Sequence, residues 1–71
     1  MTELRFHKRL YSGDAVDAAW RRVEMFGTFE TAEEADYWLV RVRAKNRAQQ
    51  ARLEGELCNY ALGLTAERGG P

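Results

Sequence analysis

The chain has 71 residues, and its 11 lysines and arginines balance its 11 aspartates and glutamates. This length predicts one small domain, which hides a smaller share of its surface than a large domain does and therefore gains from a partner. The balanced charge lacks the general positive excess of a nucleic-acid binder. A single cysteine and a single histidine exclude an intramolecular disulfide, a four-ligand zinc site and an iron–sulfur cluster, so we expect no cofactor.

The apolar runs are too short to cross a membrane, and the first ten residues lack the apolar segment of a secretory signal. With no disulfide to form, the chain fits a reducing compartment. We therefore expect a cytoplasmic protein that makes no membrane contact.

The first element predicted is a β-strand over residues 3–11. Apolar and basic residues alternate there, which is typical of a strand with one buried face. The predicted buried side holds Leu4, Phe6 and Leu10, and the other side holds Arg5, His7 and Arg9.

An amphipathic helix should follow, because Ser12-Gly13-Asp14 offers a side-chain oxygen that can cap a helix start. Apolar residues then recur at helical spacing at Val16, Ala19, Trp20, Val23 and Phe26. Gly27 is the residue type that most often ends a helix.

Residues 28–44 allow two interpretations. The β-branched and aromatic residues of 37–44 favour a strand, paired with 28–31 through an acidic turn at 32–36. Alternatively, Thr31 and Glu34 form a capping box that begins a long helix. We favour the hairpin.

The pattern of residues 46–64 predicts a helix with two apolar stripes on nearly opposite faces, one of small residues and one of large residues. The small stripe is Ala48, Ala51, Gly55, Cys58 and Leu62, and the large stripe is Leu53, Leu57, Tyr60 and Leu64. Because a surface helix needs only one apolar stripe, we expect one stripe to face a partner. Gly55 either packs tightly on the protein's own sheet or lets a partner helix approach closely.

These elements predict an α+β fold of order β-α-β-β-α, with a three-stranded antiparallel sheet and two helices. This is a split β-α-β arrangement, like a ferredoxin-like fold that lacks its last strand. Residues 1–65 would form the domain and 66–71 a disordered tail. The first strand would then be an open edge, where Arg5, His7 and Arg9 favour docking of an extended acidic segment.

No residue pattern points to catalysis. His7 lies between arginines without a nucleophile or an orienting carboxylate nearby in the sequence, which favours an exposed or interface histidine. Cys58 lies near the end of a helix, where a cysteine usually acts as a small apolar residue. The carboxylates Glu33, Glu34 and Asp36 lack the spacing of a calcium loop and favour a solvated turn. We therefore expect no enzyme activity.

Three segments carry a family resemblance: F-H-K-R-L-Y-S-G-D-A-V-D-A-A-W, D-Y-W-L-V-R-V-R and L-E-G-E-L-C-N-Y-A-L-G-L-T. Over residues 4–65 the chain resembles the small accessory protein (HxsD type) of the His-Xaa-Ser peptide system. In that family the closing helix carries a signature that here falls on Leu57, Asn59, Tyr60 and Leu62. The resemblance implies a setting of radical-SAM enzymes that modify a peptide, in which this chain presents the peptide or stabilises the maturation enzyme.

The leading hypothesis is a non-catalytic adaptor or scaffold subunit that binds a protein or peptide. It would use the first strand's edge (Arg5, His7, Arg9), a stripe of the last helix, or both. A second hypothesis is a homo-oligomeric module whose last helices pair through Leu53, Leu57, Tyr60 and Leu64. A third, less favoured, is a small nucleic-acid-binding regulator that uses Arg41, Arg43, Arg47 and Arg52.

Overall fold

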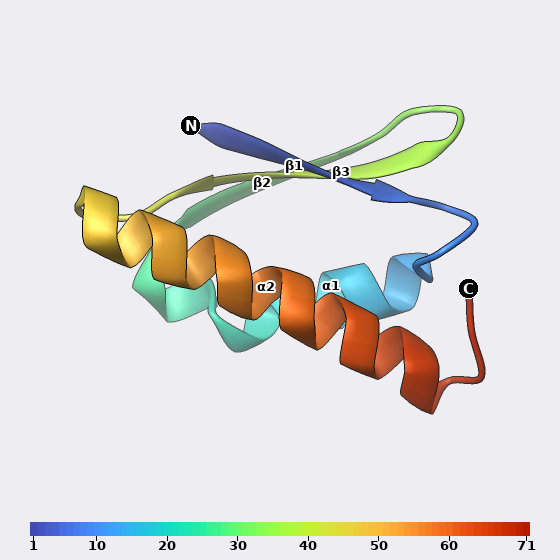
Figure 1. Cartoon of the computed structure of the whole chain (residues 1–71). Helices are drawn as coiled ribbons and strands as arrows, with labels where there is room; N and C mark the ends of the chain where they lie inside the picture. The colour runs from blue at the N-terminus through green and yellow to red at the C-terminus, as the bar shows by residue number, and fades with distance from the viewer.

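The computed structural model describes all residues, 1–71, and has the predicted element order β-α-β-β-α. The strands are β1 (Thr2–His7), β2 (Thr28–Glu33) and β3 (Tyr37–Arg43). The helices are α1 (Gly13–Arg22) and α2 (Arg47–Glu67), with a short 3-10 turn, η1 (Glu24–Phe26), after α1. Figure 1 shows a sheet in one layer and both helices in a second layer on one of its faces.

The sheet has the order β1-β3-β2, with β3 antiparallel to both neighbours. β1 and β2 therefore run in the same direction on either side of β3, which makes β1-α1-β2 a split β-α-β unit. The hairpin interpretation of residues 28–44 is confirmed. β2 continues to Glu33, two residues beyond the predicted end, because Ala32 and Glu33 still pair with Leu39 and Trp38.

The core lies between the sheet and the two helices. In the register, Leu4 and Phe6 of β1 pair with Val40 and Trp38 of β3, so these four side chains share the face covered by the helices. A larger cluster holds Phe6, Ala15, Val16, Ala19, Val40, Leu57, Ala61 and Leu64. A smaller cluster at the other end holds Val23, Val42 and Leu53.

β1 ends earlier than the sequence predicted. The N–H groups of Leu10 and Tyr11 both donate to the carbonyl of His7, which turns the chain at residues 8–11 and ends the extended segment. Leu10 is consequently 65% exposed, although the alternating pattern placed it on the buried face.

α1 begins as predicted, since the Ser12 hydroxyl accepts the N–H of Ala15 at 3.0 Å. It ends at Arg22, and the chain continues as η1, so Phe26 leaves the predicted apolar stripe and is 58% exposed. Gly27 has an extended backbone and does not end the helix as predicted. A Cβ there would lie 2.6 Å from the carbonyl oxygen of Arg43, so this position requires glycine for close approach.

α2 is capped by Asn46, whose side-chain oxygen accepts the N–H of Gln49 at 2.9 Å. The helix continues to Glu67, past the predicted end at residue 64 and into the predicted tail. Gly69 and Gly70 have positive φ, and the Gly70 N–H donates to the Thr65 carbonyl to close the last turn. Neither helix combines the length and apolar character needed to cross a membrane.

Candidate docking surfaces

The large stripe of α2 belongs to the core of the single chain. Leu53, Leu57 and Leu64 are buried, and only Tyr60 reaches the surface, where the Arg22 guanidinium lies 5.4 Å from its ring centroid. The three leucines fill the space under the sheet and α1, so they cannot also face a partner. The structure thus corrects the partner-facing role predicted for them, and with it the helix pairing of the homo-oligomer hypothesis.

The small stripe lies on the outer face of α2, away from the sheet. Ala48, Ala51, Gly55 and Leu62 are exposed, and Cys58 is half-buried at the border with the core face. A Cβ built on Gly55 would meet nothing within 4 Å, which rules out tight packing of this glycine on the protein's own sheet. The same holds for Gly63. We call this stripe the outer face of α2.

Cys58 is held in its neutral form. Burial raises the pKa of its thiol, and the negative charge of Glu54 one helical turn away raises that pKa further. A reactive cysteine needs the opposite environment, with a cationic neighbour that lowers the pKa. Cys58 therefore contributes a small apolar surface.

The outer edge of β1 offers unpaired backbone groups, as expected for a strand with no neighbour beyond it. The Lys8 N–H donates to the Asp36 carbonyl at 2.9 Å, next to the last register pair of β1 and β3. Because hydrogen-bonded pairs alternate in an antiparallel ladder, the backbone groups of Glu3, Arg5 and His7 point away from β3. An added strand could hydrogen-bond to these three residues.

The basic side chains of β1 and of the turn that follows it mostly interact with other residues of the chain. Arg5 pairs with Glu34 and lies 4.7 Å from the Tyr37 ring centroid. Lys8 pairs with Glu33. The Nδ1 atom of His7 accepts the Arg9 N–H at 3.1 Å. The predicted preference of this edge for an acidic segment therefore depends mainly on Arg9, which is exposed and has no ion-pair partner.

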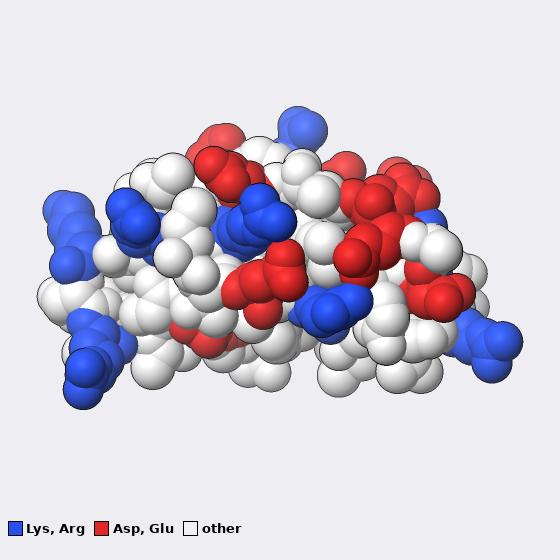
Figure 2. Space-filling model, turned by 90° about the horizontal axis from the view of Figure 1, so that it is seen from above, with Lys and Arg blue, Asp and Glu red and all other residues white.

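Two of the four arginines of the nucleic-acid hypothesis are paired with carboxylates of the chain. Arg41 contacts Glu3 at 3.3 Å and Glu30 at 3.8 Å, and Arg52 pairs with Glu56 on α2. Arg43 and Arg47 are exposed near the connection between β3 and α2. Figure 2 looks onto the face of the sheet opposite the helices, where carboxylates gather toward the end with the β2–β3 turn and basic groups dominate the opposite end.

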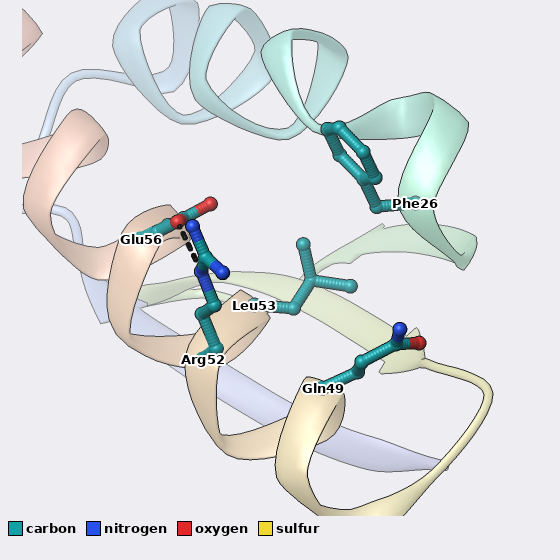
Figure 3. Close-up of a pocket in the computed structure, with 5 residues that line it drawn as sticks. All are labelled: Phe26, Gln49, Arg52, Leu53 and Glu56. Carbon is teal, nitrogen blue, oxygen red and sulfur yellow. Dashed lines mark hydrogen bonds and ion pairs between the residues drawn. The ribbon is translucent and has the colours of Figure 1, made fainter.

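Sequence reasoning missed a pocket between η1 and the first half of α2. It measures about 210 Å³ and is lined by Phe26, Gln49, Arg52, Leu53 and Glu56. In Figure 3 the Phe26 ring stands at its rim opposite Leu53, and the Arg52–Glu56 ion pair borders another side. Met25 beside it is 83% exposed. The available signal was the pair of large apolar residues directly before Gly27, of which the helical spacing assigned Phe26 to the core.

No three His, Cys, Asp or Glu side chains are grouped closely enough to hold a metal ion. In comparisons with known proteins, no family model matches the chain, and neither a curated protein nor a solved structure matches it.

Proposed function

We propose that this protein is a non-catalytic adaptor that binds another protein through the outer face of α2. The observation that carries the proposal is that this face is uncharged and exposed along several turns, and includes Leu62 at 56% exposure. Gly55 adds to it, since a glycine inside a helix costs about 1 kcal/mol relative to alanine. No intramolecular contact offsets that cost, whereas close approach of a partner helix would.

The resemblance to the His-Xaa-Ser accessory family suggests which partner to test first. We propose a peptide-maturation enzyme of the radical-SAM type, with a peptide substrate as the other possible cargo. The chemistry would belong to that enzyme, because an iron–sulfur cluster usually needs four thiolates and this chain has a single cysteine. Leu53, Leu57 and Leu64 are buried in the core of the single chain. If α2 helices of two copies pair, they must therefore use the outer face of α2.

Site-specific photo-crosslinking tests the proposal. A photoreactive amino acid replaces Leu62 on the outer face of α2, and in a matched control it replaces Arg43, which is also exposed but lies on β3. Both proteins are expressed in the native host, irradiated and analysed by mass spectrometry. We expect one defined heterologous adduct from position 62 and none of that mass from position 43.

A second variant checks that the face itself is recognised. Gly55→Leu adds bulk where a side chain meets open space, so the fold should persist while the adduct disappears. An adduct of twice the chain mass would replace the adaptor with a homo-oligomeric module. Identical adducts from both positions, or an adduct unaffected by Gly55→Leu, would contradict the proposal.

A further inference from the structure

β2 forms the second open edge of the sheet, and all of its residues except Phe29 are exposed. The Glu34 N–H donates to the Tyr37 carbonyl at 2.9 Å, one step beyond the last register pair of the hairpin. By the alternation of an antiparallel ladder, the backbone groups of Phe29, Thr31 and Glu33 point away from β3. A neighbouring strand could therefore hydrogen-bond to three successive outward positions.

A hollow flanks this edge on each face of the sheet. On the helix side, a groove of about 380 Å³ lies between α1 and the sheet, with Val16, Thr31, Trp38 and Val40 among its lining. On the opposite side, a hollow of about 260 Å³ is lined by Glu30, Thr31, Ala32 and Arg41. Successive side chains of a strand point to opposite faces, so an added strand would place its side chains alternately in the two hollows.

The charges around the β2 edge favour a basic occupant. The lining of the helix-side groove includes three carboxylates, those of Asp14, Asp17 and Glu33. Glu33 is paired with Lys8, whose ammonium also lies 4.5 Å from the Trp38 ring centroid, so the acidic charge left for a partner lies on α1, at Asp14 and Asp17. Asp17 has no ion-pair partner, and the side chain of Asp14 is 88% exposed beside Arg68 at 3.5 Å. Native proteins commonly protect an edge strand from unwanted pairing with a lysine, a proline or a bulge. β2 contains no lysine and no proline.

We propose that the β2 edge binds an extended segment of a partner protein that carries lysine or arginine at alternate positions, as a fourth strand. Its residues opposite Thr31 and Glu33 point into the helix-side groove, where they meet the α1 carboxylates of Asp14 and Asp17. This binding surface is separate from the outer face of α2, so either can fail without the other.

A second copy of the same chain is a poorer occupant. Its other open edge is β1, whose single arginine, Arg5, is already paired with Glu34, and Lys8 just beyond β1 is paired with Glu33 of the same chain. If β1 of one copy paired with β2 of the next, Arg5 and Lys8 could reach the acidic groove only by breaking these ion pairs. If the ion pairs stayed intact, β1 would bring no free positive charge to the groove. A segment with unpaired basic side chains gains both the ladder and the charge interaction.

The test is an NMR titration of the ¹⁵N-labelled full chain with a synthetic peptide, acetyl-Val-Lys-Thr-Lys-Val-Lys-Thr-Lys-Val-amide. We expect chemical-shift changes and slower amide exchange at Phe29, Thr31 and Glu33, and weaker binding as salt increases. The same peptide with glutamate in place of lysine should not bind. Thr31→Pro removes one outward N–H without touching the ladder to β3 and should weaken binding roughly tenfold.

Matched variants keep the outcome decisive. His7→Pro removes an outward N–H from the β1 edge instead, without breaking an ion pair, and should leave the affinity unchanged. Asp17→Lys reverses a groove charge and should weaken binding at low salt, whereas Glu67→Lys at the end of α2 should not. Protection at Glu3, Arg5 and His7, equal binding of the glutamate peptide, or concentration-dependent shifts without any peptide would each overturn the proposal.

Discussion

The buried hydroxyl of Thr65 near the end of α2 accepts the backbone N–H of Ser12, the residue that caps α1, at 3.2 Å. The same hydroxyl donates to the Ala61 carbonyl at 2.7 Å. One side chain thus joins the start of the first helix to the end of the second. Thr65 is also the only buried polar residue of the chain.

Replacing Thr65 by valine should destabilise the fold by roughly 1–2 kcal/mol, because the part-buried Ser12 N–H loses its partner while the packing volume is kept. Urea unfolding followed by circular dichroism measures the change. Thr65→Ser keeps the hydroxyl and should cost less than the valine variant. A valine variant as stable as the parent would show that this bond contributes nothing.

Gly55→Ala and Gly63→Ala should each stabilise the isolated chain by about 0.5–1 kcal/mol. Both positions are helical and open, so the added methyl group meets no neighbour and alanine is the better helix former. Thermal and urea unfolding measure the gain. Gly27→Ala is the contrasting control and should destabilise, because its Cβ would lie 2.6 Å from the Arg43 carbonyl oxygen. Loss of stability at Gly55 would mean that the outer face of α2 is not open.

Gln50 links α2 to the end of β3, and we expect Gln50→Ala to cost roughly 1–3 kcal/mol. Its side chain accepts the Ala44 N–H at 2.7 Å and donates to the Val42 carbonyl at 3.1 Å. Truncation therefore leaves the part-buried Ala44 N–H without a partner and removes one hydrogen bond to Val42. Gln49→Ala removes an exposed neighbour and serves as the control. Equal unfolding free energies for the two variants would contradict this role.

Cys58 should react with iodoacetamide more slowly in the folded chain than in urea at mildly alkaline pH. Its raised pKa means that a smaller fraction is thiolate at any pH below that value, so the pH–rate curve lies to the alkaline side of the unfolded chain's curve. Glu54→Gln removes the second cause of the shift and should move the curve toward lower pH, though only partly, because burial is the larger cause. Glu56→Gln removes a different helix carboxylate, which does not contribute to the raised pKa, and should leave the pH–rate curve unchanged.

The element order, the capping Ser12 and the hairpin could be predicted because they depend on local signals. Alternating β-branched residues in 37–44 and an oxygen-bearing side chain before a helical pattern act over a few residues. The ends of elements could not be predicted as well. β1 stops at His7 because of a turn closed by the Leu10 and Tyr11 amides, which the alternation of apolar residues does not encode.

The two stripes of α2 were visible in the sequence, but which one faces the core was not. Helical spacing gives the angle between stripes and contains no information about where the sheet lies. In the folded chain Leu53, Leu57 and Leu64 are buried, so the large stripe faces the core. Likewise, the pairing of Arg5 with Glu34 joins residues 29 positions apart, so the neutralisation of the β1 edge required the sheet order.

Placing β3 in the middle of the sheet also constrains how the chain folds. β1 has no strand to join until residues 37–43 are in place, because β3 is its only neighbour. The β2–β3 hairpin closes over a three-residue turn and can form early, whereas β1 must close a loop of about thirty residues. The N-terminal strand is therefore expected to dock last and, under mild denaturation, to detach first, leaving the hairpin and α2 as the more persistent part.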